Sequence, residues 1–152
     1  MTITDDMKKQ TIGMASDHAG YELKEQLKPF LKELGYKIKD FGAYSAESMD
    51  YADTAHPLAE AVEKGEVDFG IAMCGSGNGI SMTLNKHQGI RDALCWIPEI
   101  AALAKQHNNA NIITLPARFI SEELARETVL AYLNATFEGD RHQRRIDKIP
   151  CR

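Results

Sequence analysis

A glycine-rich loop is the part of the sequence whose residue types and spacing most clearly suggest chemistry. Residues 74–79 read Cys-Gly-Ser-Gly-Asn-Gly and follow directly after a mostly apolar run at 67–73. Glycine tolerates unusual backbone dihedrals and close approach, so a loop of this kind that opens a helix can aim several N–H groups at one point. That arrangement suits an anion or a developing oxyanion. The alternative is a tight glycine turn that binds nothing.

The loop does not match the glycine motifs of nucleotide-binding proteins. Its spacing is GxGxG rather than GxGxxG, because Ile80 occupies the last position. Asp92 is the nearest acidic candidate for a ribose hydroxyl, and Lys86 is misplaced for a Walker A lysine. A dinucleotide site is therefore disfavoured.

Cys74 stands between the apolar run and the glycines. A thiol near a helix N-terminus is biased towards thiolate and can act as a nucleophile or a base, although most free cysteines are small buried hydrophobes. Cys95 lies beside Trp96 in an expected strand, which favours a core position, and Cys151 receives no role. The three cysteines show no CxxC spacing, so we expect thiols in a reducing cytoplasm.

The histidines and a basic tail supply further candidates. His18 and His107 are expected at strand ends or loops on the active edge of a sheet, whereas His56 precedes Pro57 and is expected to help start a helix. No two histidines form an HxxxH pair, so the sequence predicts no metal site. Arg141 and Arg145 are four apart and could grip one phosphate from a helix face, although a solvated basic face is the alternative.

Composition bounds the function classes. The chain has 152 residues, 18 Lys and Arg against 22 Asp and Glu, and a net charge of −4, which argues against a general nucleic-acid binder. No apolar run approaches a membrane span, and the N-terminus has no secretory h-region. We expect one domain over 1–152, with a loose lead-in at 1–9 and a basic helix at 140–150.

The elements that must position these residues alternate along the chain. Short apolar runs alternate with helical patterns, which predicts parallel βαβ units in a Rossmann-like three-layer α/β/α sandwich with a five-stranded parallel sheet. In such a sheet, ligands bind beyond the carboxyl ends of the strands. Pro29 should kink or divide the first helix. The expected strands are 11–16, 36–41, 67–73, 92–97 and 112–115, and the expected helices are 21–34, 56–64, 80–87, 99–107 and 123–133.

Four motifs in order resemble one known family. DHAG at 17–20, CGSGNGISM at 74–82, QHNNAN at 106–111 and EGDRHQRR at 138–145 resemble the type B ribose-5-phosphate isomerases, a group that includes galactose-6-phosphate isomerase subunits. The resemblance covers 11–150. It implies strand order 2-1-3-5-4, a homodimer or dimer of dimers with shared active sites, and no metal or organic cofactor.

The resemblance also implies a role for individual positions. Cys74 matches the catalytic base, Ser76 a hydroxyl position, and His107 the ring-opening histidine. Asn78 departs from the apolar residue of several members and keeps only its backbone N–H as a contact. The substrate-binding positions, with the phosphate set last, are Asp17, His18, Tyr51, Gly75, Gly77, Gly79, Asn108, Arg118, Arg141, His142 and Arg145.

The implied activity is interconversion of ribose 5-phosphate and ribulose 5-phosphate through a cis-enediolate. Six-carbon aldose phosphates such as allose 6-phosphate or galactose 6-phosphate are alternative substrates. A non-catalytic sugar-phosphate or nucleotide sensor on the same fold is a further alternative, because fold does not dictate function. The expected partner is a phosphorylated sugar, with no nucleic acid and no membrane.

Overall fold

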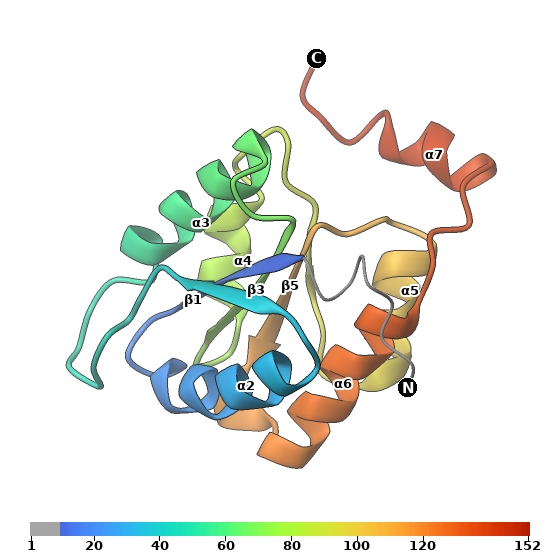
Figure 1. The fold of residues 1–152 in the computed structure, drawn as a ribbon. Coiled ribbons are helices and arrows are strands. Elements are labelled where there is room, and N and C mark those ends of the chain that lie inside the picture. The colour runs from blue at the N-terminus through green and yellow to red at the C-terminus, as the bar shows by residue number, and fades with distance from the viewer. Residues whose placement is uncertain (1–9) are drawn as a thin grey trace.

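The computed structural model describes residues 10–152, which form a five-stranded parallel sheet in the order β2-β1-β3-β5-β4 (Figure 1). All four strand pairs are parallel. The fold class and the strand order expected from the sequence are therefore confirmed. The strands are β1 (Thr11–Ser16), β2 (Lys37–Asp40), β3 (Phe69–Cys74), β4 (Asp92–Leu94) and β5 (Ile112–Pro116).

Helices cover both faces of this sheet (Figure 1). One face packs against α2 (Tyr21–Glu33), α5 (Pro98–Gln106) and α6 (Glu122–Asn134). The other face packs against α3 (Ala52–Lys64) and α4 (Asn78–Leu84). A 3₁₀ turn, η1 (Ala117–Phe119), follows β5, and α7 (Arg141–Ile146) stands apart from the two helix layers near the C-terminus.

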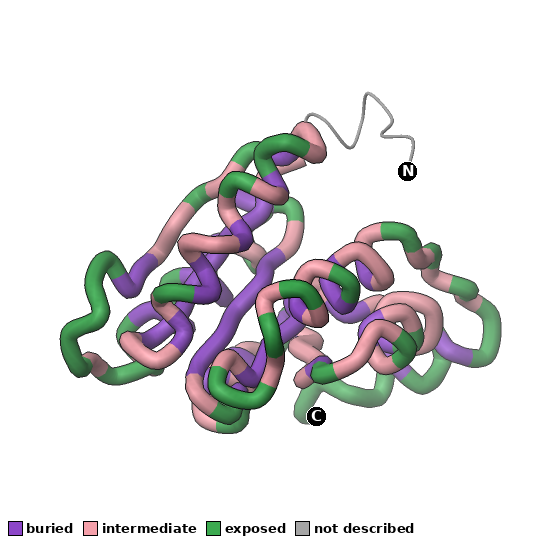
Figure 2. The backbone as a smooth tube through the Cα atoms, turned by 90° about the horizontal axis from the view of Figure 1, so that it is seen from below, coloured by how far each residue is buried: buried purple, intermediate pink, exposed green. Residues whose placement is uncertain are grey.

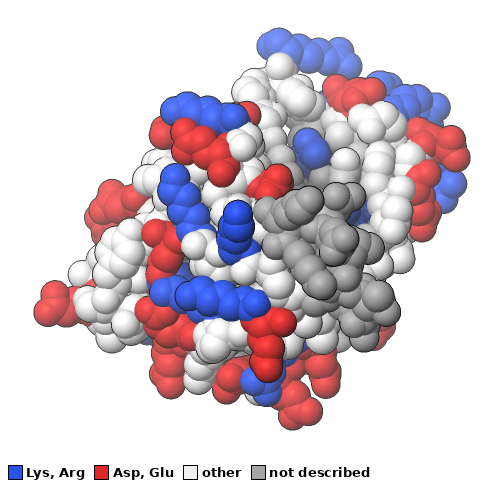
Figure 3. All heavy atoms as spheres, in the orientation of Figure 1, with Lys and Arg blue, Asp and Glu red and all other residues white. Residues whose placement is uncertain are grey.

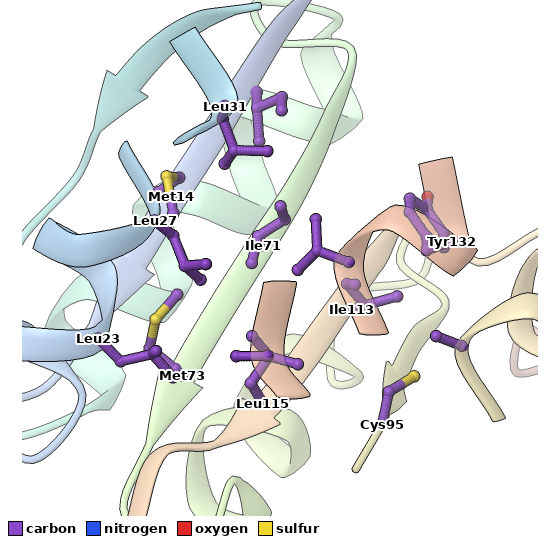
Figure 4. Close-up of a cluster of buried hydrophobic side chains, with 14 of the residues drawn as sticks. Met14, Leu23, Leu27, Leu31, Ile71, Met73, Cys95, Ile113, Leu115 and Tyr132 are labelled. Carbon is purple, nitrogen blue, oxygen red and sulfur yellow. The ribbon is translucent and has the colours of Figure 1, made fainter. Parts of the chain in front are cut away.

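The core follows the period of two along the central strands. Met14, Ile71 and Ile113 point to the layer of α2 and α6, where they meet Leu27 and Leu31 (Figure 4). Their chain neighbours, such as Ala15 and Ala72, point to α3 and α4. The middle strands are therefore buried on both faces, as Figure 2 shows, which explains their continuously apolar sequence.

Several boundaries differ from the sequence prediction. The helix α3 begins at Ala52, so His56 lies in its second turn and does not start it. Thr54 explains the difference, because its hydroxyl donates to Ser16 O at 2.8 Å and ties this polar turn to the end of β1. Pro29 does not divide α2, since it lies on the exposed side, where the carbonyl left unpaired by proline can be solvated.

The later elements are also shorter or shifted. β4 ends at Leu94, so Cys95 follows the strand, yet the side chain is buried as expected. The basic tail is helical only over Arg141–Ile146 rather than 140–150. The expected lead-in at 1–9 lies outside the described residues. Across residues 10–152 we find no helix with the length and apolar character that crossing a membrane requires.

Candidate active site

The carboxyl ends of β1, β3 and β5 bring the first group of expected site residues together. Asp17 follows β1, Cys74 ends β3, and Arg118 lies in the turn after β5. The backbone N–H of Arg118 donates to Gly75 O at 2.9 Å. A Cβ on Gly75 would lie 3.4 Å from the Arg118 guanidinium, so this cation lies against the glycine-rich loop.

The glycines of the loop are required by the backbone and by close packing. Gly77 has a φ of +81° as it caps α4, and a Cβ there would lie 2.4 Å from Leu94. A Cβ on Gly79 would lie 2.5 Å from the ring of Tyr51. Larger residues at these two positions would displace Leu94 or Tyr51, which explains why the sequence has glycine at both.

Ser76 changes one expectation about the loop. Its hydroxyl oxygen accepts the backbone N–H of Asn78 at 3.2 Å. The Asn78 N–H, which we expected to be available to substrate, is therefore already engaged within the loop. The side chains of Ser76 and Asn78 are both exposed.

Cys95 and Cys151 differ from Cys74 in their position relative to the glycine-rich loop. Cys74 is 4% exposed and lies in the register opposite Pro116 at the carboxyl edge. Desolvation, with a contribution from Asp92, raises the pKa of Cys95 to about 12, which makes that buried thiol unreactive. Cys151 is exposed near the C-terminus, far along the chain from the loop.

Hydrogen bonds fix Asp17 and His18 after β1. Asp17 is buried, and its Oδ1 accepts the backbone N–H of Gly20 at 3.1 Å, at the start of α2. His18 Nδ1 accepts the backbone N–H of Met49 at 3.2 Å. Since Nδ1 is an acceptor, Nε2 carries the proton and is the ring nitrogen left to donate to a ligand.

His107 lies at the opposite edge of the sheet, which corrects the expectation that it shares an edge with His18. His107 is the C-cap residue of α5, and the loop after it leads into the amino end of β5. A hydrogen bond marks the same amino ends of β4 and β5. The backbone N–H of Arg91, directly before β4, donates to Oδ1 of Asn111, directly before β5, at 2.8 Å. The physical reason is that a crossover helix runs antiparallel to the strand before it, so its last residue returns to the amino edge.

The basic tail joins His107 rather than Cys74. The backbone N–H of Glu138 donates to Gln106 O at 3.0 Å, which places α7 beside the end of α5. In Figure 1 α7 lies away from the arrowhead of β5, and Figure 3 shows Lys and Arg side chains interspersed with Asp and Glu side chains over that part of the face. Arg141 and Arg145 are exposed on α7, and Asn108 is exposed beside His107.

Two imidazoles stack in this second group. The rings of His107 and His142 are 4.3 Å apart at 12°, and Glu138 Oε1 lies 3.7 Å from His107 Nε2 and 3.5 Å from His142 Nε2. Desolvation, and then the charges of Arg141 and His107, lower the pKa of His142. We did not predict Glu138 from the sequence, although its spacing of four residues before His142 was a usable signal.

One chain therefore holds two partial sites at opposite edges. The carboxyl-edge group contains the thiol, the glycine-rich loop and one arginine. The amino-edge group contains the exposed histidine and the two tail arginines. The arrangement is that of a parallel α/β protein able to bind an anionic ligand and move protons.

Comparison with known proteins gives the family. The ribose/galactose isomerase family model matches residues 12–149. Ribose-5-phosphate isomerase B of Escherichia coli is 43% identical over 94% of this chain and 95% of its own length. D-erythrulose-4-phosphate isomerase of Pectobacterium atrosepticum is 36% identical over 91% of this chain and 92% of its own.

Solved structures agree with this relationship. Ribose 5-phosphate isomerase of Thermotoga maritima has a TM-score of 0.91 and 48% identity, covering 93% of this chain and 97% of that one. Ribose-5-phosphate isomerase B of Mycoplasma genitalium with bound ribulose 5-phosphate has a TM-score of 0.87 and 42% identity, covering 91% and 93%. The chain belongs to the ribose/galactose isomerase family, so the resemblance seen in its motifs is confirmed. It is an enzyme of the sugar-phosphate isomerase type.

Proposed function

We propose that the enzyme interconverts ribose 5-phosphate and ribulose 5-phosphate, with Cys74 as the base. The observation that carries the proposal is the position of Cys74 at the carboxyl end of β3, directly before the glycine-rich loop against which the Arg118 guanidinium lies. The relatives named for this activity and the one that holds ribulose 5-phosphate support the choice of substrate.

The proposed steps move protons only. His107 transfers a proton between the ring oxygens and opens the furanose, a task suited to imidazole near neutral pH. The Cys74 thiolate removes the proton from C2, and the electron pair forms the enediolate with its charge on O1. Loop N–H groups stabilise that charge, a contribution commonly worth ~3–4 kcal/mol per strong donor. The proton returns to C1, while Ser76 relays a proton between O1 and O2.

The separation of the two partial sites gives the proposal its second part. Cys74 and His107 lie at opposite edges of one sheet, so a complete site requires the amino-edge group of a second copy. We therefore propose a homodimer, or a dimer of dimers, whose active sites combine the carboxyl edge of one copy with His107, Arg141 and Arg145 of the other. The arginines hold the phosphate, and this remote binding energy orients the reacting carbons.

The experiment measures conversion of ribose 5-phosphate by the purified chain and by Cys74→Ala. We expect turnover to be lost in Cys74→Ala while binding of substrate, followed by calorimetry, stays largely intact. Cys151→Ala is the matched control, because it removes an exposed thiol far along the chain, and it should keep full activity. Near-wild-type turnover in Cys74→Ala would remove Cys74 from the role of base.

A second candidate substrate is a sugar phosphate of different length. The Pectobacterium relative is named for a four-carbon substrate, and the family description includes galactose. Comparison of kcat/KM for ribose 5-phosphate, erythrulose 4-phosphate and allose 6-phosphate separates these possibilities. Absence of turnover with all three, together with retained binding, would instead favour a sugar-phosphate sensor.

A further inference from the structure

Three side chains of metal-ligand type converge at the amino edge. His107 comes from the end of α5, Glu138 from the segment before α7, and His142 from α7 itself. One ligand atom from each lies within 4.8 Å of the other two. It is the one group of three histidine, cysteine, aspartate or glutamate side chains with this spacing among the described residues.

His142 supplies an independent observation that points to a ligand. Its side chain is 6% exposed, and its Nε2 is buried without a hydrogen-bond partner among residues 10–152. A buried polar nitrogen without a partner is costly, and each such case calls for an explanation. This nitrogen faces Glu138 Oε1 at 3.5 Å, too long for a hydrogen bond but suited to two atoms that share a cation.

The spacing fits a small tetrahedral cation. Zinc binds imidazole nitrogen and carboxylate oxygen at ~2.0–2.2 Å, which places neighbouring ligand atoms roughly 3.3–3.6 Å apart. The Glu138 oxygen lies 3.5 Å and 3.7 Å from the two imidazole nitrogens. Two histidines and one glutamate form a known zinc ligand set that leaves a fourth position open.

One movement is required before all three can coordinate. The two rings are nearly parallel, at 12°, and a metal must lie close to the plane of each imidazole it binds. His107 is the ring able to turn, because its side chain is 40% exposed and rotation about χ2 of histidine is broad. His142 then acts as the fixed ligand and His107 as the adjustable one.

We propose that His107, Glu138 and His142 form a site for a divalent transition metal, Zn²⁺ by ligand type, and that the bound metal inhibits the isomerase. The metal occupies the Nε2 lone pair of His107 and so removes that imidazole from proton transfer. The inhibitory part rests on the proposed function, whereas the binding part rests on the geometry alone. The site needs no HxxxH pair, because Glu138 and His142 come from one segment and His107 from another.

A second histidine cluster provides the control. His56 Nδ1 and His87 Nε2 lie 2.7 Å apart and share a hydrogen bond, and His87 Nδ1 lies 3.2 Å from Glu63 Oε1. The facing nitrogens of that pair are too close together to hold a metal between them. His56→Gln therefore removes a histidine from another histidine and glutamate cluster without touching the proposed site.

The binding test uses the full chain, freed of metal, and Co²⁺ as a coloured substitute for Zn²⁺. We expect visible absorption of a low-symmetry Co²⁺ complex that saturates at one equivalent per chain and is displaced by Zn²⁺. Glu138→Gln and His142→Gln should each weaken Zn²⁺ binding by about tenfold or more, while His56→Gln leaves it unchanged. Since His142 is buried, Glu138→Gln is the variant on which the conclusion depends if His142→Gln fails to fold.

The results separate the two parts. Binding that is unaffected by Glu138→Gln, or that is lost in His56→Gln, would overturn the metal site. Binding with the expected variant pattern in a chain that shows no isomerase activity would keep the site and remove the proposed function. In an active chain, we expect Zn²⁺ to lower kcat/KM reversibly in wild type and His56→Gln, with chelator restoring it, and to inhibit Glu138→Gln only at about tenfold or higher concentration.

Discussion

The ring of Tyr51 occupies the space that a side chain on Gly79 would need. A Cβ on Gly79 would lie 2.5 Å from Tyr51 Cζ and 2.7 Å from Cε2. Tyr51 caps α3 and Gly79 lies in the first turn of α4, so the contact joins two helix starts beside the glycine-rich loop. The loop and an expected substrate-binding residue therefore hold one another in place.

This contact predicts a defect in substrate binding for Gly79→Ala. Tyr51 is 41% exposed, so its ring can swing outwards, and we expect the free energy of unfolding to fall by less than about 2 kcal/mol. KM for the sugar phosphate should rise several-fold because the displaced ring no longer meets the substrate. Steady-state kinetics and urea unfolding provide the two measurements. In a Tyr51→Ala background the same Gly79→Ala change should have little further effect, and a full-sized effect there would contradict the mechanism.

Mixing inactive variants tests the division of the site between two copies. A dimer that pairs Cys74→Ala with His107→Asn contains one site in which both residues are intact. Random mixing through an unfolding and refolding step should therefore restore about a quarter of wild-type activity.

The matched control pairs Cys74→Ala with Arg118→Ala. Both positions lie on the carboxyl edge, so every mixed dimer lacks one of the two groups at each site. We expect no recovery from this mixture. Absence of recovery from the mixture of Cys74→Ala with His107→Asn would show that the two edges do not combine across copies.

The raised pKa of the Asp92 carboxyl predicts that its contribution to stability falls as pH rises. Desolvation raises the pKa of its carboxyl from the ordinary 3.8 to about 7, although Thr114 donates a hydrogen bond to it at 2.7 Å. Between these two pKa values the folded chain holds a proton that the unfolded chain has lost. This group's contribution is therefore complete below pH about 4 and declines by up to about 1.4 kcal/mol per pH unit until pH about 7.

Asp92→Asn should remove that decline. The measurement is the free energy of urea unfolding of both proteins from pH 5 to pH 8, taken as a difference. The lowered pKa of His142 acts in the opposite direction, but it is common to both proteins and cancels. Parallel curves for the two proteins would rule out Asp92 as the source.

We expect replacement of Asp40 to lower the free energy of unfolding more than replacement of its partner Lys24. Lys24 is fully buried, and its Nζ donates to both oxygens of Asp40 at 2.8 and 2.7 Å. Asp40→Ala leaves a buried ammonium unpaired and should cost about 3–5 kcal/mol. Lys24→Met should cost clearly less, because Asp40 keeps Lys28 and the backbone N–H of Gly42 as partners. Urea unfolding at neutral pH measures both, and equal losses would contradict this reasoning.

The sequence predicted those features that depend on local pattern. The run at 67–73 is mostly apolar because β3 is buried on both faces. Glycine is needed at 77 because φ is positive there, and at 79 because the ring of Tyr51 lies close. The start of α3 was missed because Thr54 is polar yet buried, and its hydroxyl bonds to a strand far away in the chain. Such a contact leaves no local pattern.

The sequence names candidate site residues one by one, but it does not show at which end of the sheet each of them lies. Each motif marks a position along the chain, whereas the edge of the sheet on which it falls depends on the direction of the preceding helix. His107 illustrates this, because α5 carries it back to the amino edge. The spacing of Glu138 and His142 is visible in the sequence, but the contact of Glu138 with His107 arises only because the end of α5 meets the segment before α7.

Cys74 and the cationic tail lie at opposite ends of the sheet, and the proposed shared site requires that these two surfaces meet between copies. Under the proposed shared site, a twofold axis lets two copies satisfy each other completely, with their sheets running in opposite directions and no half-site left over. A head-to-tail contact of the same two surfaces would leave one surface unused at each end and permit growth into a chain of subunits. The symmetry of the assembly thus decides whether these surfaces produce a closed enzyme or an open polymer.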